Sequence, residues 1–116
     1  MTPTEWFHKM REIWLQKEPA LIATLIAHEV RYYESPLSPP LTSVSEIINA
    51  WKEIEEQEIE LLEIIILHED HNIALAQWRF RQANQADLVG CYFLKLDEQG
   101  KCTEFRQWWH GQEVHT

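Results

Sequence analysis

The first half of the chain shows helical spacing of apolar residues, interrupted by short polar breaks. The spacing i, i+3, i+4, i+7 predicts an amphipathic helix over residues 4–16, with its apolar positions at Trp6, Phe7, Met10, Ile13, Trp14 and Leu15. Thr4 is the expected N-cap, and Lys17-Glu18-Pro19 ends the helix. Pro19 suits the first turn of a second helix, which we expect to run to about Ala27.

A short strand over residues 30–34 is expected next, ended by the proline-rich loop 35–40. A third helix then begins at Ser43 or Ser45, because Ser43 and Glu46 have capping-box spacing. Its apolar positions share one face: Val44, Ile47, Ile48, Trp51 and Ile54. The acidic run 53–60 is interpreted as a solvated helix end and loop.

The second half has the apolar alternation and turn residues of β-strands. We expect strand 59–68, a turn at 69–72, strand 73–81, a polar loop 82–87 and a closing hairpin 90–110. Helices followed by antiparallel strands predict a single α+β domain over residues 1–116. Its architecture is a strongly bent antiparallel sheet covered by three N-terminal helices, which form a cone with an internal pocket.

The charge of the chain narrows the possible partners. A formal net charge of −9 disfavours nucleic acid and anionic membrane surfaces, because both are bound through Lys and Arg. No apolar run approaches the roughly 20 residues that cross a bilayer, and the N-terminus has no secretion signal, so we expect a cytoplasmic protein. The three glycines never cluster into a nucleotide-binding loop, and we expect no cofactor.

Several segments in order resemble the nuclear transport factor 2-like superfamily, particularly its SnoaL-like branch, which has a cystatin-like α+β cone. The resemblance covers essentially the whole chain and rests on Trp14, Lys17-Glu18-Pro19, Tyr32-Tyr33-Glu34-Ser35-Pro36, Ile47 through Trp51, Ala76-Gln77-Trp78 and the 92–110 hairpin. Members of the superfamily include ketosteroid isomerases, polyketide cyclases, dehydratases, epoxide hydrolases and non-catalytic binding modules. The fold therefore does not determine the function.

The ketosteroid isomerase pattern is absent at the matching positions. Ser35 stands where the isomerase has its aspartate base, and a neutral serine cannot abstract a proton unaided. The tyrosine donor of the isomerase falls near Arg11, and its buried carboxylic acid falls at Tyr92. Trp51 stands in place of a supporting tyrosine. The resemblance therefore does not imply steroid isomerisation.

Alternation gives the two faces of the closing hairpin separate roles. With a turn centred on Glu98-Gln99, Leu96 pairs with Lys101 and Cys91 with Arg106, which separates Cys91 and Cys102 by about 13 Å, too far for a disulfide. One face supplies a pocket wall of Tyr92, Gln107 and Trp109. The opposite face, with Phe93, Arg106, Trp108 and both cysteines, is the expected homodimer interface.

Glu63 is an acidic intruder in an otherwise apolar strand. One register of strand 73–81 places it opposite Trp78 on the inner face, where desolvation would make it a candidate general base with Tyr92 as hydrogen-bond donor. The other register sends Gln77 and Arg79 inward and leaves Glu63 solvated or in an interface. The sequence does not decide between the two registers.

Three other polar features of the sequence are candidates for a functional role. By alternation Glu34 points away from Tyr33, and we take Tyr33 as the pocket residue of the two. The run His68-Glu69-Asp70-His71 carries metal-ligand types, but we interpret it as an exposed structural turn and expect no metal. His110 could reach the pocket rim, although an exposed histidine is the favoured interpretation.

The leading interpretation is a dimeric cone that binds a small, largely apolar organic ligand. The expected lining is aromatic with one amide: Trp14, Tyr33, Trp51, Trp78, Tyr92, Gln107 and Trp109. A second interpretation is an isomerase, cyclase or dehydratase with Glu63 as base and Tyr92 as donor. A third is a non-catalytic interaction subunit whose cone is filled and whose sheet binds another protein.

Overall fold

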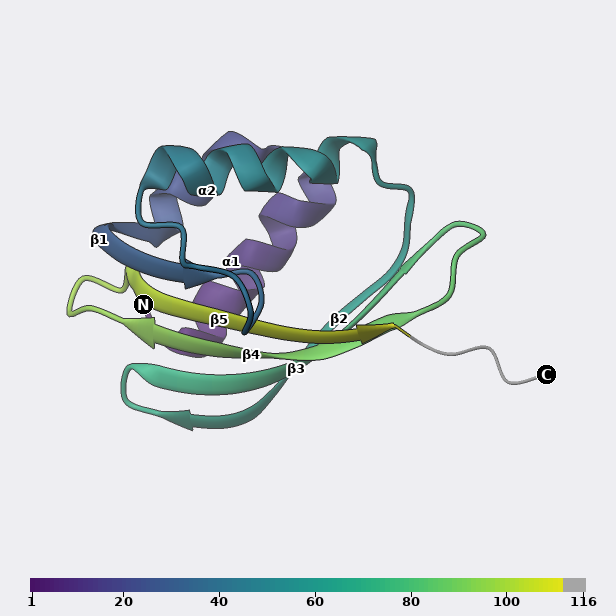
Figure 1. Ribbon diagram of the computed structural model, residues 1–116. Helices are drawn as coiled ribbons and strands as arrows, with labels where there is room; N and C mark the ends of the chain where they lie inside the picture. Colours follow the sequence, from purple (N-terminus) through teal and green to yellow (C-terminus); the bar gives the residue numbers. More distant parts are fainter. Residues whose placement is uncertain (112–116) are drawn as a thin grey trace.

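The N-terminal helix of the computed structural model, which describes residues 1–111, is α1, Pro3–Gln16 (Figure 1). Its N-cap is Thr2, two residues before the predicted Thr4. The Thr2 hydroxyl accepts from the Glu5 amide at 3.2 Å, and the Glu5 carboxylate accepts from the Thr2 amide at 3.2 Å. This capping box satisfies helix donors that Thr4 would leave open. Lys17 ends the helix in the left-handed region, with φ of 57°.

The second predicted helix is a 3-10 helix, η1, Pro19–Leu25, and the first strand begins where we expected that helix to continue. This strand, β1, spans Ile26–Tyr33 and is longer than the predicted 30–34. Ser43 caps α2, Val44–Trp51, as predicted, and accepts from the Glu46 amide at 3.2 Å. A second 3-10 helix, η2, Lys52–Glu56, continues α2 through the first half of the acidic run.

The remaining four strands form an antiparallel meander. They are β2, Ile59–Asp70, β3, Ile73–Gln82, β4, Leu88–Leu96, and β5, Cys102–Gly111. The sheet order is β1-β5-β4-β3-β2, and β1 runs parallel to β5. The sheet is therefore mixed, and the prediction of a wholly antiparallel sheet was wrong at this edge. Alternation within a strand does not encode its long-range partner or its direction.

Two strand registers differ from the predicted ones. In the β2–β3 pair Glu63 lies opposite Arg79, so neither predicted register holds, because Trp78 points inward while Glu63 and Arg79 share the outer face. In the final hairpin Cys91 pairs with Trp108 instead of Arg106. A bulge between Lys95 and Leu96 then pairs Leu96 with Cys102. It turns Cys102 into the core, away from the face we had assigned to it.

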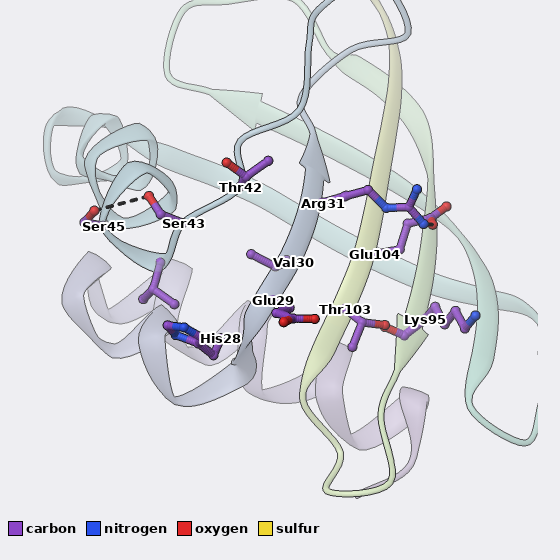
Figure 2. Close-up of a pocket in the computed structure, with 11 residues that line it drawn as sticks. His28, Glu29, Val30, Arg31, Thr42, Ser43, Ser45, Lys95, Thr103 and Glu104 are labelled. Carbon is purple, nitrogen blue, oxygen red and sulfur yellow. Dashed lines mark hydrogen bonds and ion pairs between the residues drawn. The ribbon is translucent and has the colours of Figure 1, made fainter.

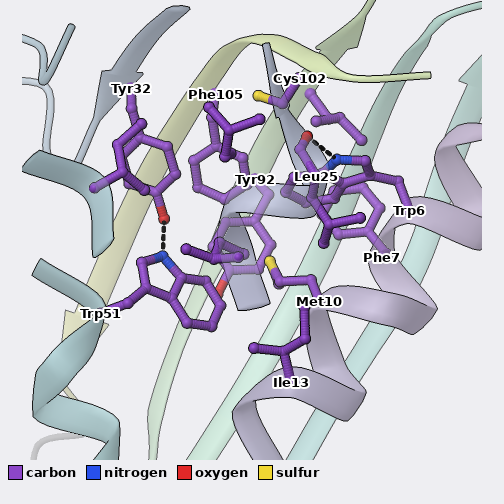
Figure 3. Packing of buried hydrophobic residues seen from close by; sticks show 14 of the residues in the cluster. Trp6, Phe7, Met10, Ile13, Leu25, Tyr32, Trp51, Tyr92, Cys102 and Phe105 are labelled. Atoms are coloured by element: carbon purple, nitrogen blue, oxygen red, sulfur yellow. Dashed lines mark hydrogen bonds between the residues drawn. The ribbon is translucent and has the colours of Figure 1, made fainter. Parts of the chain in front are cut away.

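All the helices lie over one face of the sheet, here called the inner face, and the ends of β4 and β5 extend beyond them (Figure 1). Trp6 of α1 donates its indole N–H to the Leu25 carbonyl at 2.9 Å, which joins α1 to η1. Trp51 of α2 points into the same core as Phe105 of β5 (Figure 3), and Ile47 of α2 is buried in this core as well. The predicted α+β class is confirmed as helices on one side of an unclosed five-stranded sheet. Among residues 1–111 no helix has the length and hydropathy to span a bilayer.

Candidate functional site

Two hollows of the surface differ strongly in size and lining. A wide groove of about 890 Å³ runs along the β1 edge and is lined by exposed polar side chains such as His28, Glu29 and Arg31 (Figure 2). Two of its charges are already paired, since Arg31 contacts Glu104 at 2.7 Å. Glu29 and Lys95, which also line this open groove, form no ion pair within the described residues.

The second hollow is an aromatic cavity of about 60 Å³ between α2, η2 and the inner face of the sheet. Its aromatic lining comes from four different elements: Trp14 of α1, Tyr32 of β1, Trp51 of α2 and Tyr92 of β4. The remaining lining residues are Glu34, Ala50, Glu53, Ile54 and Gln107. Residues far apart in sequence thus converge on one small, half-open site with a mostly apolar lining.

Aromatic stacking holds the two tyrosines of the cavity in place. The Tyr92 ring lies between Phe7 and Trp78, with centroid distances of 5.8 and 5.7 Å and interplanar angles of 16° and 24°. Tyr32 stacks on Phe105 at 4.6 Å. Tyr92 therefore offers its hydroxyl, not a ring face, to the cavity, and Figure 3 shows that hydroxyl on the side of Trp51. Burial raises the pKa of both phenols, so both keep their protons at neutral pH.

Each nitrogen donor in the lining already has an acceptor. Trp51 donates its indole N–H to the Tyr32 hydroxyl at 2.9 Å (Figure 3). Trp14 donates to the Gln57 side-chain carbonyl at 2.7 Å, and Gln107 donates to the Glu34 backbone carbonyl at 3.3 Å. Within residues 1–111 the Tyr92 hydroxyl has no hydrogen-bond partner, although only 2% of the residue is exposed. The fully buried polar side-chain atom left without a partner in this part of the chain is the Trp78 indole nitrogen, so the Tyr92 hydroxyl is open to the cavity, where a polar atom of a ligand or a water can bind it.

Two carboxylates lie at the mouth of the cavity. Glu34 follows β1, and Glu53 belongs to η2. Partial burial raises the pKa of Glu53, and the negative charge of Glu34 raises it further. Neither carboxylate forms an ion pair within the described part of the chain. The mouth is therefore negatively charged and can hold a proton or attract a cation.

The structure brings together four of the seven predicted lining residues, namely Trp14, Trp51, Tyr92 and Gln107. Trp78 is buried behind Tyr92 and does not line the cavity. Trp109 is on the same side of β5 as Gln107, but it lies beyond the helices opposite Gly90 and is 57% exposed. The predicted pocket role of Trp109 is therefore corrected, because the helical cover ends before this residue.

The prediction that Tyr33, and not Glu34, faces the pocket was wrong. The Arg106 guanidinium lies 4.1 Å from the centre of the Tyr33 ring on the outer face of the sheet. Tyr32 and Glu34 have the opposite parity and line the cavity. Alternation correctly separated Tyr33 from Glu34, but it could not say which parity faces the helices.

The placement of Glu63 also contradicts its predicted role as a pocket base. Its side chain is exposed on the outer face, beside Arg79 of β3. The whole sheet therefore separates this carboxylate from the aromatic cavity. The carboxylates that accompany Tyr92 in the cavity lining are Glu34 and Glu53, and Glu53 is itself exposed, as expected for the acidic run.

The histidine-rich turn offers no visible metal centre. His68, Glu69 and Asp70 end β2 and His71 lies in the turn, all of them exposed. Glu69 accepts hydrogen bonds from the amide and hydroxyl of Thr4 at 2.8 and 2.9 Å, which ties the turn to α1. Residues 1–111 hold no cluster of three or more potential metal ligands. His110 is exposed and lies opposite Val89, away from the cavity lining.

Comparison with known proteins identifies the fold. No protein-family model matches the chain, and no curated protein matches it. Among solved structures, a protein with a cystatin-like fold from Silicibacter pomeroyi aligns over 95% of this chain and 75% of its own, with a TM-score of 0.73 and 19% identity. A steroid delta-isomerase from Pseudomonas aeruginosa aligns over 95% and 84%, with a TM-score of 0.73 and 10% identity.

A third structure, an NTF2-like protein of unknown function from Mesorhizobium loti, aligns over 93% of this chain and 90% of its own. Its TM-score is 0.70 and its identity 17%. The predicted resemblance to the nuclear transport factor 2-like superfamily is thus confirmed for the fold, with SnoaL-like polyketide cyclases also among the structural neighbours. Sequence identities this low establish the fold only. The function therefore has to be inferred from the residues of the site.

Proposed function

The chain has the nuclear transport factor 2-like cone fold, and we propose that it binds a small, largely apolar organic molecule in the aromatic cavity. The observation that carries this proposal is the hydroxyl of Tyr92, a 2% exposed residue of the cavity lining, which forms no hydrogen bond to a protein group within residues 1–111. A ligand with one polar atom would satisfy this hydroxyl, while Trp14 and Trp51 would cover its apolar part.

The size of the cavity limits what can enter it. Its volume of about 60 Å³ corresponds to roughly two water molecules in the liquid, whereas pockets for drug-sized ligands measure roughly 300–1,000 Å³. The cavity therefore receives one end of a ligand, or a molecule of a few heavy atoms. The rest of a longer ligand would lie at the mouth, beside Glu34 and Glu53.

Tryptophan fluorescence tests this proposal. Trp14 and Trp51 both border the cavity, so small hydrophobic compounds that enter it should change the emission in a saturable way. Tyr92→Phe should weaken the effect by about fivefold to tenfold, because it removes the polar anchor. Trp109→Ala is the matched control and should keep the response, since Trp109 lies outside the cavity. If no compound in a broad library changes the emission, a non-catalytic interaction subunit becomes the better account.

An acid–base enzyme is the second candidate, and the raised pKa of Glu53 favours it. A carboxylate with a raised pKa is a better proton acceptor, and a protonated phenol such as Tyr92 can donate a hydrogen bond to a developing negative charge. This pair could carry out an isomerisation, cyclisation or dehydration. Loss of turnover in Glu53→Gln, with normal ligand binding, would favour catalysis; unchanged turnover would remove Glu53 from the mechanism.

We also propose that two copies of the chain associate through the outer face of the sheet. This face carries apolar side chains from four strands: Ile65 and Leu67 of β2, Leu75 of β3, Phe93 of β4 and Trp108 of β5. Ile65 is 51% exposed and Trp108 is 42% exposed. Arg106, which contacts Glu104 at 2.8 Å, provides the polar border of such an interface. The net charge of −9 disfavours both nucleic acid and a membrane surface as partners. We also propose a cytoplasmic location.

A further inference from the structure

The hydrogen-bonding groups that remain free in the aromatic cavity are mostly acceptors. The indole N–H groups of Trp51 and Trp14 and the amide of Gln107 are already committed to protein acceptors. Acceptor capacity remains on the two phenol oxygens, on the Gln107 side-chain carbonyl and on the two glutamates at the mouth. The lining can therefore accept hydrogen bonds from the donors of a ligand at several atoms, while each phenol also keeps one O–H that can donate.

The charge of the lining is one-sided as well. Glu34 and Glu53 are its ionisable carboxylates, and none of the lining residues within 1–111 is basic. Four arginines elsewhere in this range, Arg31, Arg79, Arg81 and Arg106, pair with the carboxylates of Glu104 and Asp87 instead. The repulsion between Glu34 and Glu53 is consequently uncompensated, which agrees with the raised pKa of Glu53. A positive charge at the mouth would relieve this repulsion.

This inference rests on the proposed small-molecule function. We propose that the ligand of the cavity is an organic cation, namely a protonated primary amine on a short alkyl chain. An alkylammonium has three N–H donors, which the Tyr92 oxygen and the carboxylates of Glu34 and Glu53 can accept. Its methylene groups would pack against Trp14 and Trp51, and indoles attract cations.

The size of the cavity fits this ligand class. A volume of about 60 Å³ accommodates an ammonium group and one or two carbons, with any further chain at the mouth. The overall charge of −9 raises the local concentration of cations near the protein and disfavours anionic ligands. Size, charge and hydrogen-bonding capacity thus point to the same chemistry.

The test is an NMR titration that follows the indole N–H signals of Trp51 and Trp14. The probes are propylammonium chloride, the uncharged 1-propanol and sodium propionate, with ionic strength held constant by NaCl. Propylammonium should shift both signals in a saturable way and bind about tenfold more tightly than 1-propanol, because of its charge-assisted hydrogen bonds. Propionate should produce no saturable shift.

Two variants test whether Glu53 and Glu34 cause the tighter binding of propylammonium. Glu53→Gln and Glu34→Gln should each weaken propylammonium binding by about tenfold and leave 1-propanol binding unchanged. Glu55→Gln is the matched control, since it removes the same charge from an exposed position of η2 outside the lining, and it should leave the affinity for propylammonium unchanged.

The possible failures are distinguishable. If 1-propanol binds as tightly as propylammonium, or if both glutamate variants bind propylammonium normally, the ligand is not a cation, while small-molecule binding stands. If none of the three probes shifts the indoles but neutral compounds change the fluorescence, the amine inference is overturned alone. If nothing binds in either experiment, both proposals fall.

Discussion

The Trp51 indole donates its N–H to the Tyr32 hydroxyl at 2.9 Å, which links α2 to β1 across the edge of the cavity. Both residues are buried, at 7% and 6% exposure. We predict that Tyr32→Phe destabilises the protein by about 1–3 kcal/mol, because it leaves the Trp51 N–H buried without an acceptor. Chemical denaturation measures this change. Tyr33→Phe is the control, since Tyr33 lies on the outer face; equal stability of the two variants would contradict the prediction.

The raised pKa of Glu53 predicts that the stability of the protein depends on pH. Its pKa is raised in the folded protein above the ordinary value of 4.5, so the folded state is favoured when Glu53 is protonated and loses stability as the pH rises through the folded pKa. Glu53→Gln should therefore have a higher Tm than the parent protein at pH 7, and the difference should vanish below about pH 4, where Glu53 is protonated in both states. Thermal denaturation across this range provides the measurement. A lower Tm for Glu53→Gln than for the parent protein at pH 7 would contradict the assignment.

Gly90 lies where β4 leaves no room for a side chain. A Cβ at this position would collide with the Trp108 carbonyl oxygen and would approach the Trp78 ring to 2.6 Å. We predict that Gly90→Ala destabilises the protein by about 1–3 kcal/mol through overpacking. At Gly111 a Cβ would meet its nearest neighbour, Leu88, at 3.6 Å, so Gly111→Ala should be close to neutral. Equal denaturation midpoints for the two variants would show that β4 and β5 can separate at low cost.

If two copies of the chain associate through the outer face of the sheet, a single charged substitution on this face should dissociate the dimer. Sedimentation of the parent protein should show a dimer at micromolar concentration, and Trp108→Glu should shift it to a monomer by placing a charge in a desolvated interface. The control is Trp109→Glu, the adjacent residue of the same type on the opposite side of β5, which should remain dimeric. A monomeric parent protein, or dissociation in both variants to the same extent, would reject the interface.

Local chemistry explains why the element order could be predicted from the sequence. The third helix began at Ser43, as its capping box indicated, and the hairpin alternation placed Tyr92 and Gln107 on the inner face. These features depend on neighbours within a few residues. The parallel pairing of β1 with β5 depends on residues more than 70 positions apart, such as Tyr32 and Phe105, and no local pattern encodes it.

The errors at the site have a related origin. Tyr33 and Glu63 were placed by alternation, which divides a strand into two faces but does not say which face the helices cover. Trp109 had the correct parity, but the extent of the helical cover decided its exposure. Glu53 was hidden among acidic neighbours, since only the turn of η2 singles it out from Glu55 and Glu56.

The most direct measurement of ligand binding compares the parent protein with a variant whose cavity is filled. Ala50 of α2 lines the cavity, and Ala50→Leu would occupy it without disturbing helical propensity. We predict that small hydrophobic compounds, and propylammonium in particular, shift the Trp51 indole signal saturably in the parent protein but not in folded Ala50→Leu. Identical shifts in both proteins, or no shift in the parent protein, would contradict the assignment of this cavity as a binding site.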